Sequence, residues 1–146
     1  MKLFSINLLI LSSLVFTGWE TDFELAKQKA HKEHKYILLN FSGSDWCGPC
    51  IRMKEEIFEN TEFKNYADTN LVLLNADFPR AKKNQLEKKQ QEKNDKLAEK
   101  YDPDGSFPFT VLMNDEGKVL NNWEGFPGKG ATDFVKQVKE ILNAHK

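Results

Sequence analysis

Two cysteines stand three residues apart in the run Trp46-Cys47-Gly48-Pro49-Cys50, and the 146-residue chain has no others. A disulfide between them would close a very short loop, which constrains an unfolded chain only slightly. The pair is therefore better suited to redox chemistry than to structural stabilisation. At this spacing one thiolate can attack a partner disulfide, and the second cysteine can then resolve the mixed disulfide.

That chemistry is favoured when the first cysteine lies at the start of a helix. Residues 36–41 form a nearly continuous apolar run, which predicts a strand buried on both faces, and a helix is predicted from Cys47 through Ile57. The free N–H groups and positive dipole end of a helix N-terminus favour a thiolate at Cys47. Pro49 is compatible with the first helical turn. Cys47 is thus the predicted nucleophile and Cys50 the resolving cysteine, with Trp46 as an apolar shoulder for an incoming chain.

The remaining pattern predicts an α/β domain with one mixed sheet covered by helices. The two strands joined by a helix should be parallel, and the last two strands should form a hairpin. The expected elements are helix 21–34, strand 36–41, helix 47–57, a helical turn at 60–66, strand 71–76, strand 109–113, strand 118–123 and helix 131–144.

A charged segment separates the second and third strands. Residues 80–100 hold eight Lys or Arg and four Asp or Glu, with few apolar positions among them. This pattern predicts a solvated helix docked by one thin apolar stripe, and the alternative is a basic surface that receives an acidic partner.

The first 18 residues differ from the rest of the chain. Lys2 supplies positive charge, residues 3–16 are mostly apolar, and no acidic residue precedes Glu20. The apolar run is short for a membrane span and typical of a secretory signal peptide. We therefore expect a signal peptide at 1–18, a folded domain at 19–146 and export to the periplasm. An interfacial anchor and a buried N-terminal strand are the alternatives.

The whole-chain composition is that of one soluble domain. Hydrophobic residues make up 40% and charged residues 29%, and the formal net charge is −1. Nearly balanced charge gives no reason to expect a nucleic-acid partner. A monomer is expected.

The Trp-Cys-Gly-Pro-Cys motif after a strand resembles the active site of the thioredoxin superfamily. The runs that begin at Phe41 and Gly105 (Phe-Ser-Gly-Ser-Asp-Trp-Cys and Gly-Ser-Phe-Pro-Phe-Thr-Val-Leu) resemble exported bacterial thioredoxin-like proteins. The resemblance covers about residues 19–144. It implies a thioredoxin fold with a mixed four- to five-stranded sheet flanked by helices. It also implies a thiol–disulfide oxidoreductase that acts on protein disulfides and needs no cofactor or metal.

The resemblance also implies the peptide-binding residues. Pro108 stands where the family has a cis-proline, so the Phe107–Pro108 bond is expected to be cis, with the backbone of Phe107 free to pair with a bound peptide. Gly48 and Pro49 are expected to contact substrate as well. An ordinary trans proline at a strand start is the alternative for Pro108.

Two positions depart from cytoplasmic thioredoxins. A buried Asp of the family is matched here by Asn40, and a companion Lys by Leu73. Because Asn takes up no proton at neutral pH, the proton of Cys50 needs another route, such as water.

The direction of electron flow is predicted from the two residues between the cysteines. Gly-Pro resembles the reducing thioredoxins, so a reductant or general disulfide exchanger is expected, and the resemblance implies a membrane-bound reductase as electron donor. A disulfide-donating oxidase is the alternative within this class. A non-catalytic binding module and a zinc site formed by His31, His34 and the two cysteines are the alternatives outside it.

Overall fold

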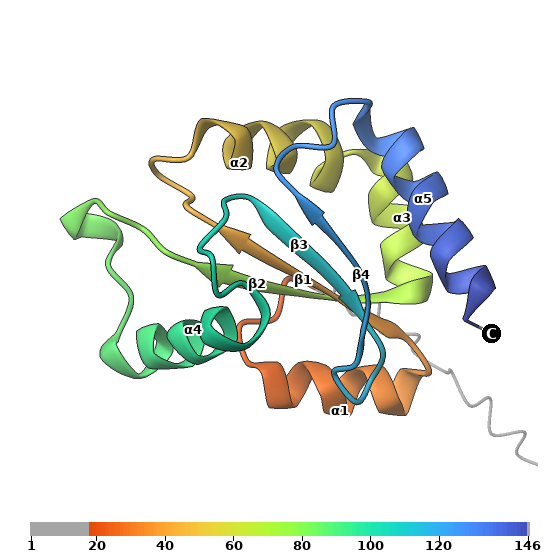
Figure 1. Cartoon of the computed structure of the whole chain (residues 1–146), viewed down its shortest axis with the longest axis horizontal. Helices are drawn as coiled ribbons and strands as arrows, with labels where there is room; N and C mark the ends of the chain where they lie inside the picture. Colours follow the sequence, from red (N-terminus) through yellow and green to blue (C-terminus); the bar gives the residue numbers. More distant parts are fainter. Residues whose placement is uncertain (1–17, 146) are drawn as a thin grey trace, which may run out of the picture.

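The computed structural model describes residues 18–145. Residues 1–17, and with them nearly all of the predicted signal peptide 1–18, lie outside the described part. The elements follow the predicted order (Figure 1). They are α1 (Phe23–Glu33), β1 (Tyr36–Ser42), α2 (Gly48–Met53), a π-helical turn (Lys54–Phe58), α3 (Thr61–Asn70), β2 (Leu71–Asp77), a 3₁₀ turn (Lys82–Asn84), α4 (Lys88–Tyr101), β3 (Phe109–Met113), β4 (Val119–Glu124) and α5 (Gly130–Ala144).

The strands form one mixed sheet in the order β2-β1-β3-β4. β1 pairs with β2 in parallel and with β3 antiparallel, and β3 and β4 form the expected antiparallel hairpin. Outside β2, Glu20 adds a single parallel bridge to Leu74. The sheet therefore has four full strands, at the lower end of the predicted four to five, with one bridge where a fifth strand would lie.

Helices cover both faces of the sheet (Figure 1). One core lies beneath α2, α3 and α5, and the other lies between the sheet and α1 with α4. Side chains of β1 alternate between them, with Leu38 in the first core and Leu39 in the second, and both are fully buried. This double burial explains why β1 reads as a continuous apolar run. β1 is thereby fixed as a central strand, and the active-site loop begins where β1 ends.

The segment 80–100 differs from the single helix predicted for it. The α-helix begins only at Lys88, and residues 80–87 form a loop with one short 3₁₀ turn. The expected thin docking stripe is present in α4, where Asn94 and Leu97 are buried. The start of this loop donates backbone hydrogen bonds to a carboxylate from the active-site loop, described below.

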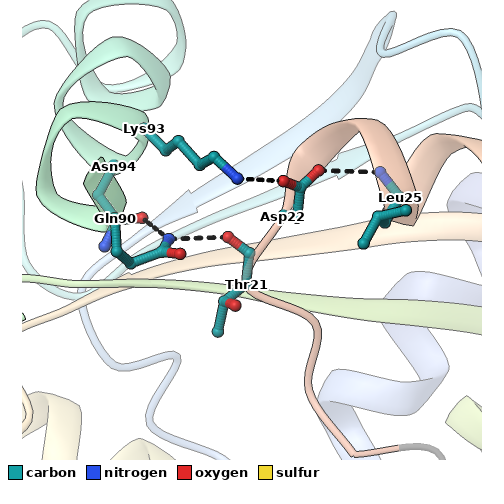
Figure 2. Close-up of polar contacts among 6 residues, drawn as sticks. All are labelled: Thr21, Asp22, Leu25, Gln90, Lys93 and Asn94. Atoms are coloured by element: carbon teal, nitrogen blue, oxygen red, sulfur yellow. Dashed lines mark hydrogen bonds and ion pairs between the residues drawn. The ribbon is translucent and has the colours of Figure 1, made fainter. Parts of the chain in front are cut away.

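Polar contacts join α4 to the start of α1 (Figure 2). Asp22 is the N-cap of α1, accepting a hydrogen bond from the backbone N–H of Leu25 at 3.0 Å, and it also pairs with Lys93. Gln90 donates from its side chain to the carbonyl of Thr21 at 2.9 Å. The hydrogen bond from Lys93, followed by that from Leu25, lowers the pKa of the Asp22 carboxyl. One residue thus caps α1 and holds α4 against it.

No helix within residues 18–145 combines the length and apolar character needed to cross a membrane.

Candidate active site

Cys47 and Cys50 lie at the junction of the β1–α2 loop and α2, and a disulfide joins them with 5.2 Å between their Cα atoms. Cys47 is the N-cap of α2, so its backbone is extended while Cys50 lies in the first turn. The predicted helix therefore begins at Gly48, one residue later than expected, and it passes into a π-helical turn at Lys54. Pro49 occupies the first turn, where a missing N–H leaves no intrahelical bond unmade.

The sulfur of Cys47 receives a backbone hydrogen bond. Cys50 donates its N–H to Cys47 Sγ at 3.2 Å, as a helix N-cap would accept it. Charged acceptors make stronger hydrogen bonds than neutral ones, so this contact favours a thiolate over a thiol when the disulfide opens. Only 6% of the surface of Cys47 is exposed, and Cys50 is 5% exposed. A substrate disulfide can therefore reach the Cys47 sulfur only by contacting the residues around it.

Trp46 is fixed in place by the loop that precedes it and by the end of β2. Its indole N–H donates to the carbonyl of Phe78 at 2.7 Å. Gly43 lies directly beneath the indole ring, where a Cβ atom would come within 2.3 Å of it. The close approach requires glycine at position 43. Together with the hydrogen bond to Phe78, this contact fixes the position of the Trp46 ring, the predicted apolar contact for a substrate chain.

Phe107 joins Trp46 in an aromatic cluster beside the disulfide. Its ring lies edge-on to Trp46 at 5.4 Å between centroids and to Phe78 at 5.5 Å. The Phe107–Pro108 peptide bond is cis. The carbonyl of Pro108 accepts a hydrogen bond from the N–H of Gly125 at 2.8 Å. The backbone N–H and C=O of Phe107 make no hydrogen bond with any residue of 18–145.

Asn40 lies buried beneath α2 with 6% of its surface exposed. Thr110 donates its hydroxyl to Asn40 Oδ1 at 3.1 Å, and the same hydroxyl lies 3.9 Å from the sulfur of Met53, one turn after Cys50. A neutral, hydrogen-bonded amide therefore occupies the place for which the resemblance implies an acid in cytoplasmic thioredoxins. Leu73 packs against the core on the α3 and α5 face.

The sequence reading did not single out Asp45 or Arg80, and the structure brings them together. Asp45 accepts hydrogen bonds from the backbone N–H groups of Arg80 and Ala81 and from the side chain of Asn84, each at 2.9 Å. These bonds, that from Arg80 first, lower the pKa of the Asp45 carboxyl. The only signal in the sequence is that Asp45 lies two residues before Cys47. No neighbouring residue indicates which distant backbone N–H groups its carboxylate binds.

A second carboxyl, Asp102, lies at the start of the loop that leads to Pro108. It is 4% exposed, and its Oδ1 accepts from the N–H of Ser106 at 2.9 Å. Among the described residues its Oδ2 has no hydrogen-bond partner. Burial raises the pKa of this carboxyl, which the bond from Ser106 only partly offsets. Its contribution to stability is therefore fully present below the unfolded-state pKa and is lost as pH rises through the folded-state pKa.

The residues of the zinc alternative are held apart. His31 and His34 belong to the end of α1, whereas the cysteines begin α2, and the sheet lies between the two helices (Figure 1). His31 Nδ1 instead pairs with Asp115 Oδ2 at 2.7 Å. Within residues 18–145 no group of three or more His, Cys, Asp or Glu side chains is placed to hold a metal ion.

Comparisons with known proteins agree with this geometry. A family model described as thioredoxin-like matches residues 18–114. The disulfide bond reductase DsbH of Chlamydia pneumoniae is 40% identical over 124 residues, which are 85% of this chain and 72% of that protein. A solved structure of a DsbH oxidoreductase superposes with a TM-score of 0.78 and 36% identity, covering 86% of this chain and 84% of that one. A poplar thioredoxin h shares the fold, with a TM-score of 0.56 and 18% identity over 82% of this chain and 87% of that one.

The chain therefore belongs to the thioredoxin-like family and has the predicted thioredoxin fold. It is a thiol–disulfide oxidoreductase whose redox couple is the Cys47–Cys50 pair. The predicted enzyme class and the predicted redox pair are both confirmed.

Proposed function

We propose that the protein is a reductant of protein disulfides outside the cytoplasm, with Cys47 as the attacking cysteine. The observation that carries the choice of Cys47 as the attacking cysteine is the hydrogen bond from the Cys50 N–H to Cys47 Sγ at the start of α2, which favours the thiolate. The Gly-Pro pair between the cysteines, which resembles that of reducing thioredoxins, and the similarity to a protein named as a disulfide bond reductase both support the reductive direction.

The reaction has two exchange steps. The Cys47 thiolate attacks one sulfur of the substrate disulfide, forms a mixed disulfide with it and releases the other substrate sulfur as a thiolate. Cys50 then loses its proton and attacks Cys47 Sγ, which forms the Cys47–Cys50 disulfide and releases the second substrate sulfur. Two electrons pass from the protein to the substrate. The proton of Cys50 leaves to water, because the amide of Asn40 cannot accept it.

Substrate binding uses the surface around the two cysteines. Gly48 and Pro49 are exposed beside Cys47. The backbone N–H and C=O of Phe107 can pair with an extended peptide, as a strand edge does, and Trp46 covers one side of that peptide. These four positions, with Pro108 holding Phe107 in place, form the proposed peptide site.

The proposed cellular setting rests on the N-terminal sequence and on the electrons that the reaction needs. The apolar segment at 1–18 is the proposed export signal. A reductant in an oxidising compartment must itself be reduced, so we include a membrane-bound reductase as electron donor. A monomer with one redox pair is sufficient for this chemistry, and no cofactor or nucleic acid enters it.

The test is the reduction potential of the Cys47–Cys50 couple, measured by equilibrating the domain with glutathione redox buffers. A reductant should titrate near the potential of thioredoxin, about −270 mV, and a strong oxidant near about −120 mV. A value at the oxidising end would contradict the proposed direction and make the protein a disulfide donor. The absence of any two-electron transition would contradict the redox role itself.

The assignment of the two cysteines is tested separately. A Cys50→Ser variant should accumulate a mixed disulfide between Cys47 and a substrate peptide, because nothing remains to resolve it. Cys47→Ser should trap none. Trapping by Cys47→Ser instead would reverse the roles of the two cysteines while leaving the redox couple intact.

A further inference from the structure

A hollow of about 480 Å³ opens beside the disulfide, on the side of the aromatic cluster. Two of its lining residues, Trp46 and Phe107, belong to the proposed peptide site. A polypeptide paired with Phe107 would have to pass this hollow or fill it. The full lining is Trp46, Phe78, Pro79, Arg80, Gln85, Gln91, Gly105 and Phe107.

Arg80 is the only charged residue in that lining. Its guanidinium carbon lies 3.6 Å from the centroid of the Trp46 ring, close enough for a cation–π contact. The contact leaves the edges of the guanidinium, with their N–H donors, free to meet an acceptor. Arg80 is exposed, and within residues 18–145 it forms no ion pair.

The position of Arg80 is fixed by the active-site loop. Asp45 accepts the backbone N–H of Arg80 and that of the next residue, so the chain at this point is bound to the residue that precedes Trp46. Stacking on Trp46 then orients the side chain. Because both its backbone and its guanidinium are already positioned, Arg80 loses less conformational entropy on binding an anion than a free surface lysine does.

The segment that carries Arg80 is mostly basic. Residues 80–89 carry five basic side chains against the single acidic side chain of Glu87, and none of the five forms an ion pair in the described part of the chain. The five are Arg80, Lys82, Lys83, Lys88 and Lys89. The carboxylates of Asp45 and Asp77 lie near the same loop but accept hydrogen bonds from it and from Ser44. The net charge of the segment that carries Arg80 therefore favours an acidic chain over a basic one.

We propose that Arg80 is a specificity-determining residue, which selects polypeptide substrates with a carboxylate side chain close to the disulfide that Cys47 attacks. The substrate chain pairs with Phe107, and its Asp or Glu side chain meets the Arg80 guanidinium over Trp46. This proposal rests on the proposed reductase function and adds to it the class of substrate.

The test compares matched peptides, each with one internal disulfide. One set has Glu two residues before or after the attacked cysteine, and the other has Gln at the same place. The rate constant for reduction by the dithiol protein is measured at about 20 mM and about 300 mM salt. We expect the Glu peptide to react about threefold faster at low salt, the effect of one exposed charge pair, and the preference to shrink at high salt.

Two variants distinguish a specific contact with Arg80 from a general effect of removing one positive charge. Arg80→Gln should lower the ratio of the two rate constants, Glu peptide over Gln peptide, from about three to about one. Arg52→Gln is the matched control, because Arg52 also lies over an aromatic ring, Phe126 at 4.5 Å, yet is paired with Glu56 at 3.0 Å. It should keep the preference.

Equal rates for both peptides with wild-type protein would overturn the proposal, as would an equal loss of preference in both variants. An Arg80→Gln protein that keeps the preference would also overturn it. In each of these outcomes the reductase function stands, because peptide disulfides are still reduced. If wild-type protein reduces neither peptide nor a protein disulfide, the proposed function itself fails.

Discussion

The carboxylate of Asp45 holds the backbone of Arg80, 35 residues further along the chain, by accepting its N–H at 2.9 Å. Through this contact the loop after β2 is attached to the loop that carries the redox pair. Trp46 reinforces the attachment by donating its indole N–H to Phe78. The two loops therefore form one unit, and this unit decides what a substrate meets beside Cys47.

Replacing Asp45 with Ala should loosen the loop at 78–85. Two backbone N–H groups and the Asn84 amide lose their acceptor, so the N–H groups of Arg80 and Ala81 should exchange with solvent several-fold faster than in the wild-type protein. Amide exchange followed by NMR measures this directly. The amides of β1 serve as an internal control and should be unchanged, and equal acceleration across the sheet would mean a global effect instead.

Replacing Gly43 with Ala should displace Trp46. The new Cβ would lie within 2.3 Å of the indole, so the ring must move and its hydrogen bond to Phe78 must break. We expect a loss of about 1–3 kcal/mol in the free energy of unfolding, as for other overpacked sites, together with altered tryptophan fluorescence. Gly48→Ala is the matched control for stability, because a Cβ there meets no atom within 4 Å. Equal stability of the Gly43→Ala and wild-type proteins in urea titrations would contradict the close packing of the Trp46 ring on Gly43.

Replacing Asn40 with Asp should make stability depend on pH. The carboxyl would be buried next to Thr110, and burial favours its protonated form, so its folded-state pKa lies above the unfolded one. The variant should match wild-type stability below about pH 4 and lose about 1–3 kcal/mol as pH rises toward 8. Urea unfolding at several pH values measures this. A constant difference across that range would show that the new acid is not buried.

Replacing Asp22 with Ala should cost about 1 kcal/mol of unfolding free energy at pH 7, the usual effect of losing an N-cap. Its pKa is lowered by Lys93 and by the N–H of Leu25. Its contribution is therefore present above the ordinary pKa of 3.8 and is lost as pH falls through the folded-state value. The difference between variant and wild type should narrow in acid.

The matched variant Asp22→Asn separates the cap from the charge. It keeps an oxygen to accept the Leu25 N–H but removes the pairing with Lys93. It should be more stable than Asp22→Ala at pH 7 and should show less dependence on pH than the wild-type protein. Identical curves for the Asn variant and wild type would assign the whole contribution to capping.

The sequence by itself determined the features that depend on near neighbours. The apolar run at 36–41 predicted a doubly buried strand, and the spacing of Cys47 and Cys50 at a helix start predicted the redox pair. The start of α1 near residues 21–22 was predictable for the same reason, since the cap that the structure places at Asp22 involves residues three apart. The order of the elements and the mixed sheet followed from the chirality and turn rules that act on consecutive elements.

The tertiary structure alone decided the features that depend on distant partners. Residues 80–87 form a loop where a helix was predicted, and the loop's first two residues donate backbone N–H groups to the Asp45 carboxylate, a distant partner that no local signal reports. The same holds for Gly43, whose requirement comes from the Trp46 ring folding back over it. In the sequence Arg80 is one of many basic residues in a charged segment. Only the fold places it over Trp46 beside the disulfide. Periodicity fixes which face of an element is buried, whereas long-range contacts fix which side chains meet across the site.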